Sequence, residues 1–244
     1  MNRLYGIIGY PLSHSFSPAY FSEKFEKEHI KATYKAFEIT SVHAFPDILK
    51  QHPVLCGLNV TIPYKQSIID YLDTLSPEAA MVSAVNCIDI REGLLKGYNT
   101  DVIGFEKSLL PLLKRRHKKA LILGTGGAAA AVAYVLKKWD IDYLFVSRKN
   151  EPDVLRYDQL DRNIMESHTL IINTTPLGTY PDVDDCPSIP YSFITEQHLL
   201  YDLVYNPSET MFLILGKQQG ATIKNGFEML RLQAEESWKI WNHF

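Results

Sequence analysis

The sequence predicts an α/β fold divided into two domains, and three observations support this. The chain has 244 residues, 46% of them hydrophobic, which is enough for one large domain or two modest ones. Short apolar runs alternate with segments of helical periodicity along the whole chain. In the second half these runs are continuous, as is typical of a parallel sheet covered on both faces. We place the boundary near residue 102.

The first hundred residues read as one α/β unit. Leu4–Gly9 is an apolar run that ends in a Gly-x-Pro turn, and Ser17-Pro18 has the N-cap and N1-proline pattern that opens a helix. Arg91-Glu92-Gly93 lies between two apolar runs and favours a hairpin. The other expected elements are a strand over residues 34–39, a short helix over Pro46–Lys50, a strand over Val54–Val60, a helix from Pro63 to Leu72, and the hairpin strands Val85–Ile90 and Leu94–Tyr98.

The pattern changes after Asp101. A helix over Val102–Lys114, interrupted by Pro111, leads into the basic run Lys114–Lys119. That run is typical of a solvated helix end whose cations favour the C-terminal dipole, with a specific anion site as the alternative. The expected strands are Ala120–Leu123, Tyr143–Val146, Leu170–Ile172 and Leu199–Val204, with an alanine-rich helix after the first and a last helix over Phe227–Trp241.

Charge, hydropathy and cysteine content exclude several classes of protein. Lys and Arg total 25 against 28 for Asp and Glu, so no broad positive surface indicates nucleic-acid binding. No run approaches the ~18 apolar residues of a membrane span, and the N-terminus lacks the apolar core of about 7–15 residues of a signal peptide. Cys56, Cys87 and Cys186 are widely spaced without a CxxC pair, which argues for a reducing cytoplasm and against a disulfide framework or a zinc site.

A glycine-rich turn follows the apolar strand Ala120–Leu123 and opens a helix. The segment from Gly124 to Ala129 fits G-x-G-x-x-A, a variant of the dinucleotide-binding fingerprint. Gly124 permits the tight turn, Gly126 lets the backbone approach a pyrophosphate, and Ala129 lets the helix pack closely on the strand. The amides of the helix N-terminus then face the phosphates. The alternative is a structural glycine turn without a ligand.

The residues after the next strand favour NADP over NAD. NAD-binding folds place an acidic residue about 20 positions after the first glycine, where it binds the ribose 2′-hydroxyl. Here that place holds Ser147-Arg148-Lys149. Arg148 can bind a 2′-phosphate with its guanidinium fork, and Lys149 adds charge. The alternative is that both are ordinary solvated loop cations.

Polar residues gather where several predicted strands end. Ligands of open α/β sheets bind outside the carboxyl ends of strands, so these side chains would suit a small polyhydroxylated acid. Each also has a structural reading: turn and N-cap serines, a helix-capping Asp101, and a surface Lys65 on the first turn of a helix. That last position is electrostatically poor for a cation. The residues are Ser13, Ser15, Ser17, Asn59, Thr61, Lys65, Asn86, Asn99, Thr100 and Asp101.

Seven ordered motifs over nearly the whole chain resemble the shikimate dehydrogenase family, whose members reduce 3-dehydroshikimate to shikimate with NADPH. They are Gly9–Pro18, Gly57–Lys65, Ala84–Asn86, Gly97–Gly104, Asn173–Gly178, Val204–Pro207, and Gly226–Leu230 with Gln233-Ala234.

The resemblance implies roles for individual residues. Lys65 and Asp101 would be the catalytic pair, with Lys65 giving a proton to the C3 oxygen and Asp101 positioning and balancing its ammonium group. Desolvation would lower the pKa of Lys65 and Asp101 would raise it, and the sequence does not decide which effect is larger. The substrate would also contact Ser15, Ser17, Asn59, Thr61, Asn86, Tyr205 and Gln233. NADP would contact Gly124, Gly126, Gly127, Ala128, Ser147, Arg148, Lys149, Thr174, Val204 and Gly226.

The resemblance also implies a domain plan. Residues 1–102 with the C-terminal helix 227–244 would form the substrate-binding and catalytic domain, and residues 103–226 a Rossmann-type NADP-binding domain. The last helix, which carries Gln233, would return to the first domain and close a cleft between the two. The expected protein is a cytoplasmic monomer or homodimer of the shikimate pathway of aromatic amino acid biosynthesis. It would bind a small-molecule substrate and no metal, nucleic acid or membrane.

The sequence departs from the family pattern at a few positions. Tyr10 and Phe16 replace smaller or polar residues, and Thr179 stands where methionine is usual. Ser147-Arg148-Lys149 replaces Asn-Arg-Thr, and the chain from Arg148 to Leu170 is short for a full crossover helix. Three other readings stay open: an enzyme that accepts quinate as well as shikimate, with either NADP or NAD as its cofactor; a non-catalytic NADP-binding sensor; and a methylene-tetrahydrofolate dehydrogenase.

Overall fold

The computed structural model describes residues 3–13 and 15–242. His14, inside the N-terminal serine motif, and the ends of the chain lie outside the described residues. The chain forms two compact units, Met1–Thr100 with Ala234–Phe244 (unit 1) and Asp101–Gln233 (unit 2). The chain passes between units within two helices, α4 (Thr100–Leu109) and α8 (Phe227–Asn242). The limits of the units therefore fall between residues 100 and 101 and between residues 233 and 234, whereas the expected limits lay between 102 and 103 and between 226 and 227.

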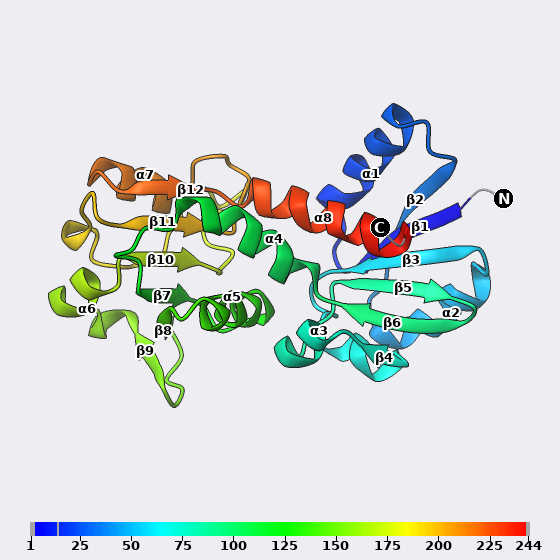
Figure 1. Ribbon diagram of the computed structural model, residues 1–244, viewed down its shortest axis with the longest axis horizontal. Coiled ribbons are helices and arrows are strands. Elements are labelled where there is room, and N and C mark those ends of the chain that lie inside the picture. The colour runs from blue at the N-terminus through cyan, green and yellow to red at the C-terminus, as the bar shows by residue number, and fades with distance from the viewer. Residues whose placement is uncertain (1–2, 14, 243–244) are drawn as a thin grey trace. The chain divides into compact units, whose positions relative to one another are not determined.

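Unit 1 is built on a mixed six-stranded sheet (Figure 1) in the order β2-β1-β3-β5-β6-β4. β1 pairs in parallel with β2 and β3, whereas β5 is antiparallel to β3 and β6. The C-terminal ends of β1, β3 and β6 and the start of β5 therefore lie along the same border of the sheet. We call this row of strand ends the edge of unit 1. The strands are β1 (Arg3–Gly9), β2 (Ala32–Glu38), β3 (Leu55–Val60), β4 (Thr74–Leu75), β5 (Cys87–Arg91) and β6 (Leu94–Tyr98), and the helices are α1 (Phe16–Lys27), α2 (Phe45–Gln51) and α3 (Pro77–Val82).

Two predicted helix starts in unit 1 are wrong. α1 begins at Phe16 with Ser15 as its N-cap, so Ser17 and Pro18 lie inside the first turn. Proline is tolerated there because the first four amides of a helix have no intrahelical partner.

The helix expected from Pro63 to Leu72 does not form. Residues 61–66 are a turn, followed by a short 3₁₀ helix, Ser67–Tyr71. The Tyr64 side chain is buried and donates from its hydroxyl to the Ile39 carbonyl oxygen at 2.6 Å. This tertiary contact holds the turn against the local helical pattern. Lys65 is therefore a turn residue and does not lie on a first helical turn.

The last helix packs on the first unit, as predicted. Ala234, Trp238 and Trp241 of α8 share a buried cluster with Tyr5 and Phe21. The ring of Trp241 stacks on Tyr5 with centroids 4.9 Å apart, and its Nε1 donates to the Ile88 carbonyl oxygen at 2.9 Å.

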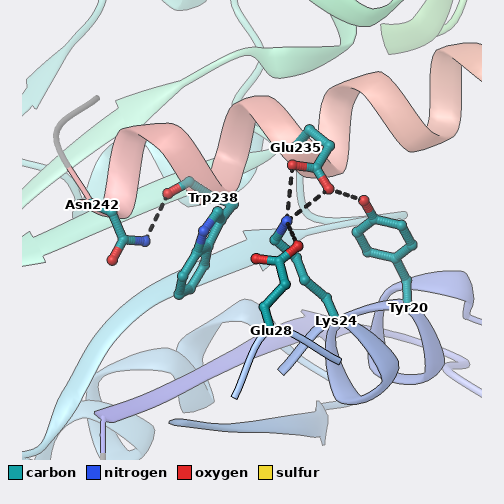
Figure 2. Close-up of polar contacts among 6 residues, drawn as sticks. All are labelled: Tyr20, Lys24, Glu28, Glu235, Trp238 and Asn242. Atoms are coloured by element: carbon teal, nitrogen blue, oxygen red, sulfur yellow. Dashed lines mark hydrogen bonds and ion pairs between the residues drawn. The ribbon is translucent and has the colours of Figure 1, made fainter. Parts of the chain in front are cut away.

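A polar cluster joins α8 to α1 in the same unit (Figure 2). Lys24 binds Glu235 at 3.0 Å and Glu28 at 2.8 Å, and the Tyr20 hydroxyl donates to Glu235. Ser17 of the serine motif lies in the first turn of α1, so this cluster holds the C-terminal helix against the helix that carries Ser17.

Unit 2 contains a six-stranded sheet that is parallel throughout, in the order β12-β11-β10-β7-β8-β9 (Figure 1). This is the order of the doubly wound Rossmann-type fold, as predicted. Every residue of the run Ala120–Leu123 is fully buried, so both faces of the central strand are covered. The elements are β7 (Lys119–Leu123), α5 (Gly127–Lys138), β8 (Asp142–Ser147), β9 (Val154–Arg156), α6 (Arg162–Ser167), β10 (Leu170–Asn173), β11 (Leu199–Asp202), α7 (Met211–Gln218) and β12 (Thr222–Lys224).

The short connection between β8 and β10 holds a small strand and a small helix. β9 pairs with β8, with Arg156 opposite Ser147, and the six-residue α6 follows. The crossover is thus shorter than a full helix, in keeping with the length of the sequence there. Within residues 3–13 and 15–242, no helix has the length and hydropathy to cross a membrane.

Candidate active site

A buried polar network lies at the edge of unit 1 where β3 ends and β5 begins. The Asn59 Oδ1 accepts a hydrogen bond from the Tyr34 hydroxyl at 2.7 Å. Its Nδ2 donates to the Asn86 carbonyl oxygen at 3.2 Å and to the Ser237 hydroxyl at 3.0 Å. Ser17 also bonds Tyr34, and burial raises the pKa of the Tyr34 phenol. Asn59 has thus committed both amide protons within the protein, so it rigidifies this edge.

Asn86 fixes the start of the helix that carries Asp101. Its Oδ1 accepts from the Thr100 amide at 2.6 Å and from the Thr100 hydroxyl at 3.2 Å. The Asn99 amide group donates to the Ala84 carbonyl oxygen at 2.9 Å. Asp101 follows as the second residue of α4 and is 8% exposed. It therefore lies within the first turn, where a carboxylate is favoured by the helix dipole, and is not the residue that caps it.

Lys65 lies in the turn after β3 with its side chain half-buried. Its carbonyl oxygen accepts from the Val85 amide at 2.7 Å, which ties the turn to the residue before Asn86. Thr61 is held at the same edge because its amide donates to the Ile8 carbonyl oxygen at 3.0 Å. The structure thus brings Thr61, Lys65 and Asn86 to one edge of unit 1, together with Ser17 and Asn59. Ser15, the N-cap of α1, is half-buried and makes no capping hydrogen bond with its side chain.

The glycine turn of unit 2 has the backbone geometry that its sequence pattern predicts. Gly124 has φ of +113°, and a Cβ there would lie 2.7 Å from the Thr174 Oγ1, so only glycine fits. Gly126 is the N-cap of the 12-residue helix α5, and as a glycine it has no side chain that could cap the helix. Among the described residues, no heavy atom apart from those of the chain neighbours and the nearby α5 backbone lies within 4 Å of where a Cβ would stand at Gly126 or Gly127. Ala128 follows in the first turn. The helix N-terminus is open, and this fits a dinucleotide pyrophosphate.

Arg148 and Lys149 follow β8 at the same edge and are exposed. The Ser147 hydroxyl accepts from the Lys149 amide at 3.2 Å and shapes the turn. Within the described part of the chain neither cation forms an ion pair, whereas Arg156 on the neighbouring strand binds Asp158 at 2.5 Å. Two exposed cations without a carboxylate partner among the described residues, at the same edge as an open helix N-terminus, fit the extra phosphate of NADP.

Three further predicted cofactor residues lie on segments at this edge of the sheet. The Thr174 hydroxyl donates to the Leu123 carbonyl oxygen at 2.7 Å, directly before Gly124. The Gly226 amide donates to the Val204 carbonyl oxygen at 3.0 Å, and a Cβ on Gly226 would lie 2.0 Å from the Leu203 carbonyl oxygen. These contacts place Thr174, Val204 and Gly226 on closely packed backbone segments.

The two remaining predicted substrate residues are also in unit 2. Tyr205 is half-buried, and burial raises the pKa of its phenol. Gln233 is buried, and its Nε2 donates to the Leu230 carbonyl oxygen one turn earlier in α8 at 2.9 Å. Lys65 belongs to unit 1 and Asp101 to unit 2, so their joint action on one substrate atom stays a prediction.

Comparison with known proteins places the chain in a family. Residues 7–88 match the model of the shikimate dehydrogenase substrate binding domain. The "Shikimate dehydrogenase (NADP(+))" of Clostridium beijerinckii is 38% identical over 249 residues, covering 98% of this chain and 92% of that protein. The chain belongs to the shikimate dehydrogenase family.

Solved structures of shikimate dehydrogenases have the same fold. The enzyme from Aquifex aeolicus superimposes with a TM-score of 0.89 at 33% identity, covering all of this chain and 93% of that one. The enzyme from Thermus thermophilus, solved with NADP(H) and shikimate, has a TM-score of 0.88 at 29% identity, covering 99% and 94%. The predicted family and fold class are thereby confirmed.

Several polar residues that organise the two candidate sites were not predicted from the sequence. Tyr34 and Ser237 complete the network around Asn59, and Asp202, Asn173 and Thr210 form a buried cluster at the ends of β10 and β11. One signal was present, because Asn173 directly follows the apolar run Leu170–Ile172 and Asp202 interrupts the run Leu199–Val204. Within residues 3–13 and 15–242, no group of three or more His, Cys, Asp or Glu side chains could hold a metal ion.

Proposed function

We propose that this chain reduces 3-dehydroshikimate to shikimate with NADPH, and so acts in the shikimate pathway of aromatic amino acid biosynthesis. The observation that carries the proposal is the combination, in a member of this family, of a buried polar sheet edge in unit 1 with an open glycine turn in unit 2. Unit 1 would bind the substrate, and unit 2 would bind the cofactor.

The residues of unit 2 fit NADP. The amides at the N-terminus of α5, opened by Gly126 and Gly127, would hold the pyrophosphate. Arg148 and Lys149 would hold the 2′-phosphate, with Thr174, Val204 and Gly226 along the nicotinamide half. The bound NADPH supplies the hydride that reduces the ketone.

Lys65 and Asp101 would handle the proton. Reduction leaves negative charge on the former ketone oxygen, and this charge needs a proton donor within hydrogen-bond reach. The Lys65 ammonium group would donate that proton, and the Asp101 carboxylate would orient and balance the ammonium. Ser15, Ser17, Thr61 and Asn86, with Tyr205 and Gln233, would hold the carboxylate and hydroxyls of the substrate in register. Asn59 would act mainly by rigidifying their edge.

The decisive experiment follows NADPH oxidation at 340 nm with 3-dehydroshikimate. We expect turnover that depends on both compounds, and shikimate oxidation with NADP+ in the reverse direction. Parallel assays with quinate and with NAD+ give the kcat/KM ratios that separate the alternatives. Tight NADPH binding without turnover would indicate the sensor, and activity only on methylene-tetrahydrofolate would reject the proposal.

We also propose a cytoplasmic location and a monomer or homodimer. All three cysteines are free, and Cys87 is fully buried, which supports a reducing compartment. Sedimentation at micromolar concentration tests the oligomeric state.

A further inference from the structure

Asp202 is a buried carboxylate that the proposed mechanism does not use. It ends β11, is 0% exposed, and accepts three hydrogen bonds. The Asn173 Nδ2 donates at 2.9 Å and the Val204 amide at 3.0 Å, both to Oδ1, and the Thr210 hydroxyl donates to Oδ2 at 2.5 Å. Within the described residues no Lys, Arg or His forms an ion pair with it.

Asn173 carries the connection on to a second segment. It lies opposite Asp202 in the parallel pairing of β10 and β11. Its Oδ1 accepts from the Thr175 amide at 3.0 Å and the Thr175 hydroxyl at 2.6 Å. Thr174 and Val204, both predicted to contact the cofactor, therefore lie on segments tied to a single carboxylate.

The charge of Asp202 has a specific consequence for these contacts. An ionised carboxylate only accepts hydrogen bonds, so all three partners must donate to it. The Asn173 amide must then point its Nδ2 at Asp202 and its Oδ1 at Thr175. An asparagine in place of Asp202 would keep one acceptor oxygen. With that oxygen toward Asn173 and Val204, its Nδ2 would donate to the Thr210 hydroxyl and reverse that hydrogen bond, and in the flipped orientation its Nδ2 would face the two N–H donors. Burial disfavours the charged form and raises the pKa of the carboxyl to about 6. A neutral side chain at position 202 would avoid this desolvation cost, so packing alone does not explain why an acid stands there.

We propose that Asp202 is a positioning residue for the cofactor, which sets the Thr174 and Val204 segments in the geometry that binds NADPH. The inference rests on the proposed NADPH-dependent function. It predicts that neutralising Asp202 weakens cofactor binding by the folded protein and leaves the substrate edge of unit 1 unchanged.

The test compares Asp202→Asn with His198→Asn at the other end of the same strand. His198 is also buried and hydrogen-bonded, to Thr195 and Met165, but lies at the opposite edge of the sheet. NADPH binding is measured by fluorescence titration at 15 °C on protein shown by circular dichroism to be folded. We expect the Kd of Asp202→Asn to rise at least tenfold and that of His198→Asn less than twofold. The KM for shikimate at saturating NADP+ should change less than twofold in both.

Two further variants cover the case in which Asp202→Asn does not fold. Thr210→Val removes the hydroxyl that donates to Asp202 and that also caps α7 by accepting from the Leu213 amide, and Thr210→Ser keeps both contacts. The Kd for NADPH should rise about fivefold in the first and stay at the wild-type value in the second. Wild-type affinity in Asp202→Asn, or in Thr210→Val when Asp202→Asn is unfolded, would overturn the proposal. Binding of NADPH is measured without substrate, so a wild-type protein that binds NADPH but fails to reduce 3-dehydroshikimate would reject the proposed function alone.

Discussion

At the scale of single residues, hydrogen bonds to the backbone fix the positions of Lys65 and Asp101, the two charged residues of the proposed reaction. The Lys65 carbonyl oxygen is held by the Val85 amide, and the residue before Asp101 is held twice by the Asn86 side chain. Each side chain therefore starts from a rigid anchor, so its substitution should alter chemistry more than folding.

Replacement of Lys65 by alanine should lower kcat about 10³-fold, because general acid catalysis contributes roughly 10²–10⁴-fold. The KM for shikimate should change less than fivefold. Steady-state assays of Lys65→Ala are compared with Lys50→Ala, which removes an exposed lysine of α2. An unchanged kcat in Lys65→Ala would remove the lysine from the proton transfer.

Replacement of Arg148 by aspartate should shift the cofactor preference toward NAD. The new carboxylate repels a 2′-phosphate and can accept from a ribose 2′-hydroxyl. The ratio of kcat/KM for NADP+ to that for NAD+ should fall at least tenfold. Arg115→Asp, which makes the same charge change at another exposed position of unit 2, should leave the ratio as it is.

At the scale of elements, α8 contributes a large part of the core of unit 1. Trp241 is buried against Tyr5 and also bonds the Ile88 carbonyl oxygen. Trp241→Ala should therefore cost about 3–5 kcal/mol of unfolding free energy, as expected for a buried aromatic ring. Urea titration followed by circular dichroism measures this. Trp139→Ala, at a 44% exposed tryptophan, should cost less than half as much. Equal losses would contradict the central place of α8.

Some elements of the fold can be predicted from the sequence and others cannot, for physical reasons. The hairpin was predictable because Gly93 stands between two apolar runs and readily adopts a positive φ, as it does in this turn together with Glu92. The four inner strands of unit 2, β7, β8, β10 and β11, were predictable because continuous apolar runs are typical of parallel strands covered on both faces. The two edge strands, β9 and β12, are only three residues long and were not predicted. The prediction of a helix after Pro63 was wrong, since the burial and hydrogen bond of Tyr64 override the local helical pattern.

Only part of the candidate site could be predicted from the sequence. The predictable part has a local sequence pattern, and the rest depends on contacts between residues far apart in the chain. The glycine turn has a local backbone requirement, so its geometry at Gly124 could be read from the sequence. The contacts of Asn59 with Tyr34 and Ser237 join residues far apart in the chain, and no local pattern reports them. The motifs therefore located the edge, while the structure showed which groups hold it together.

At the scale of the whole molecule, buried histidines should make stability depend on pH. Burial lowers the pKa of His117 and His168 below the ordinary value near 6.5. Below pH 6.5 the unfolded chain therefore binds more protons at these residues than the folded one, and stability falls as pH falls. Asp202 has the opposite sign, because its folded pKa of about 6 lies above its unfolded value.

A variant isolates the histidine contribution. His117→Gln should show a smaller decrease in unfolding free energy between pH 7.5 and 5.5 than the wild type. Urea midpoints at three pH values measure the slopes. Identical slopes would show that His117 takes up its proton equally well in the folded protein.

The sharing of unit 1 between both ends of the chain has a consequence for biosynthesis. Unit 2 is contiguous, from Asp101 to Gln233, whereas unit 1 needs the segment from Ala234 onward. On the ribosome, residues 3–100 emerge first, yet Trp238 and Trp241 reach them last. Unit 2 can therefore complete its fold during translation, while residues 3–100 complete theirs only after the segment from Ala234 onward has emerged, with an apolar surface for chaperones to cover in the meantime.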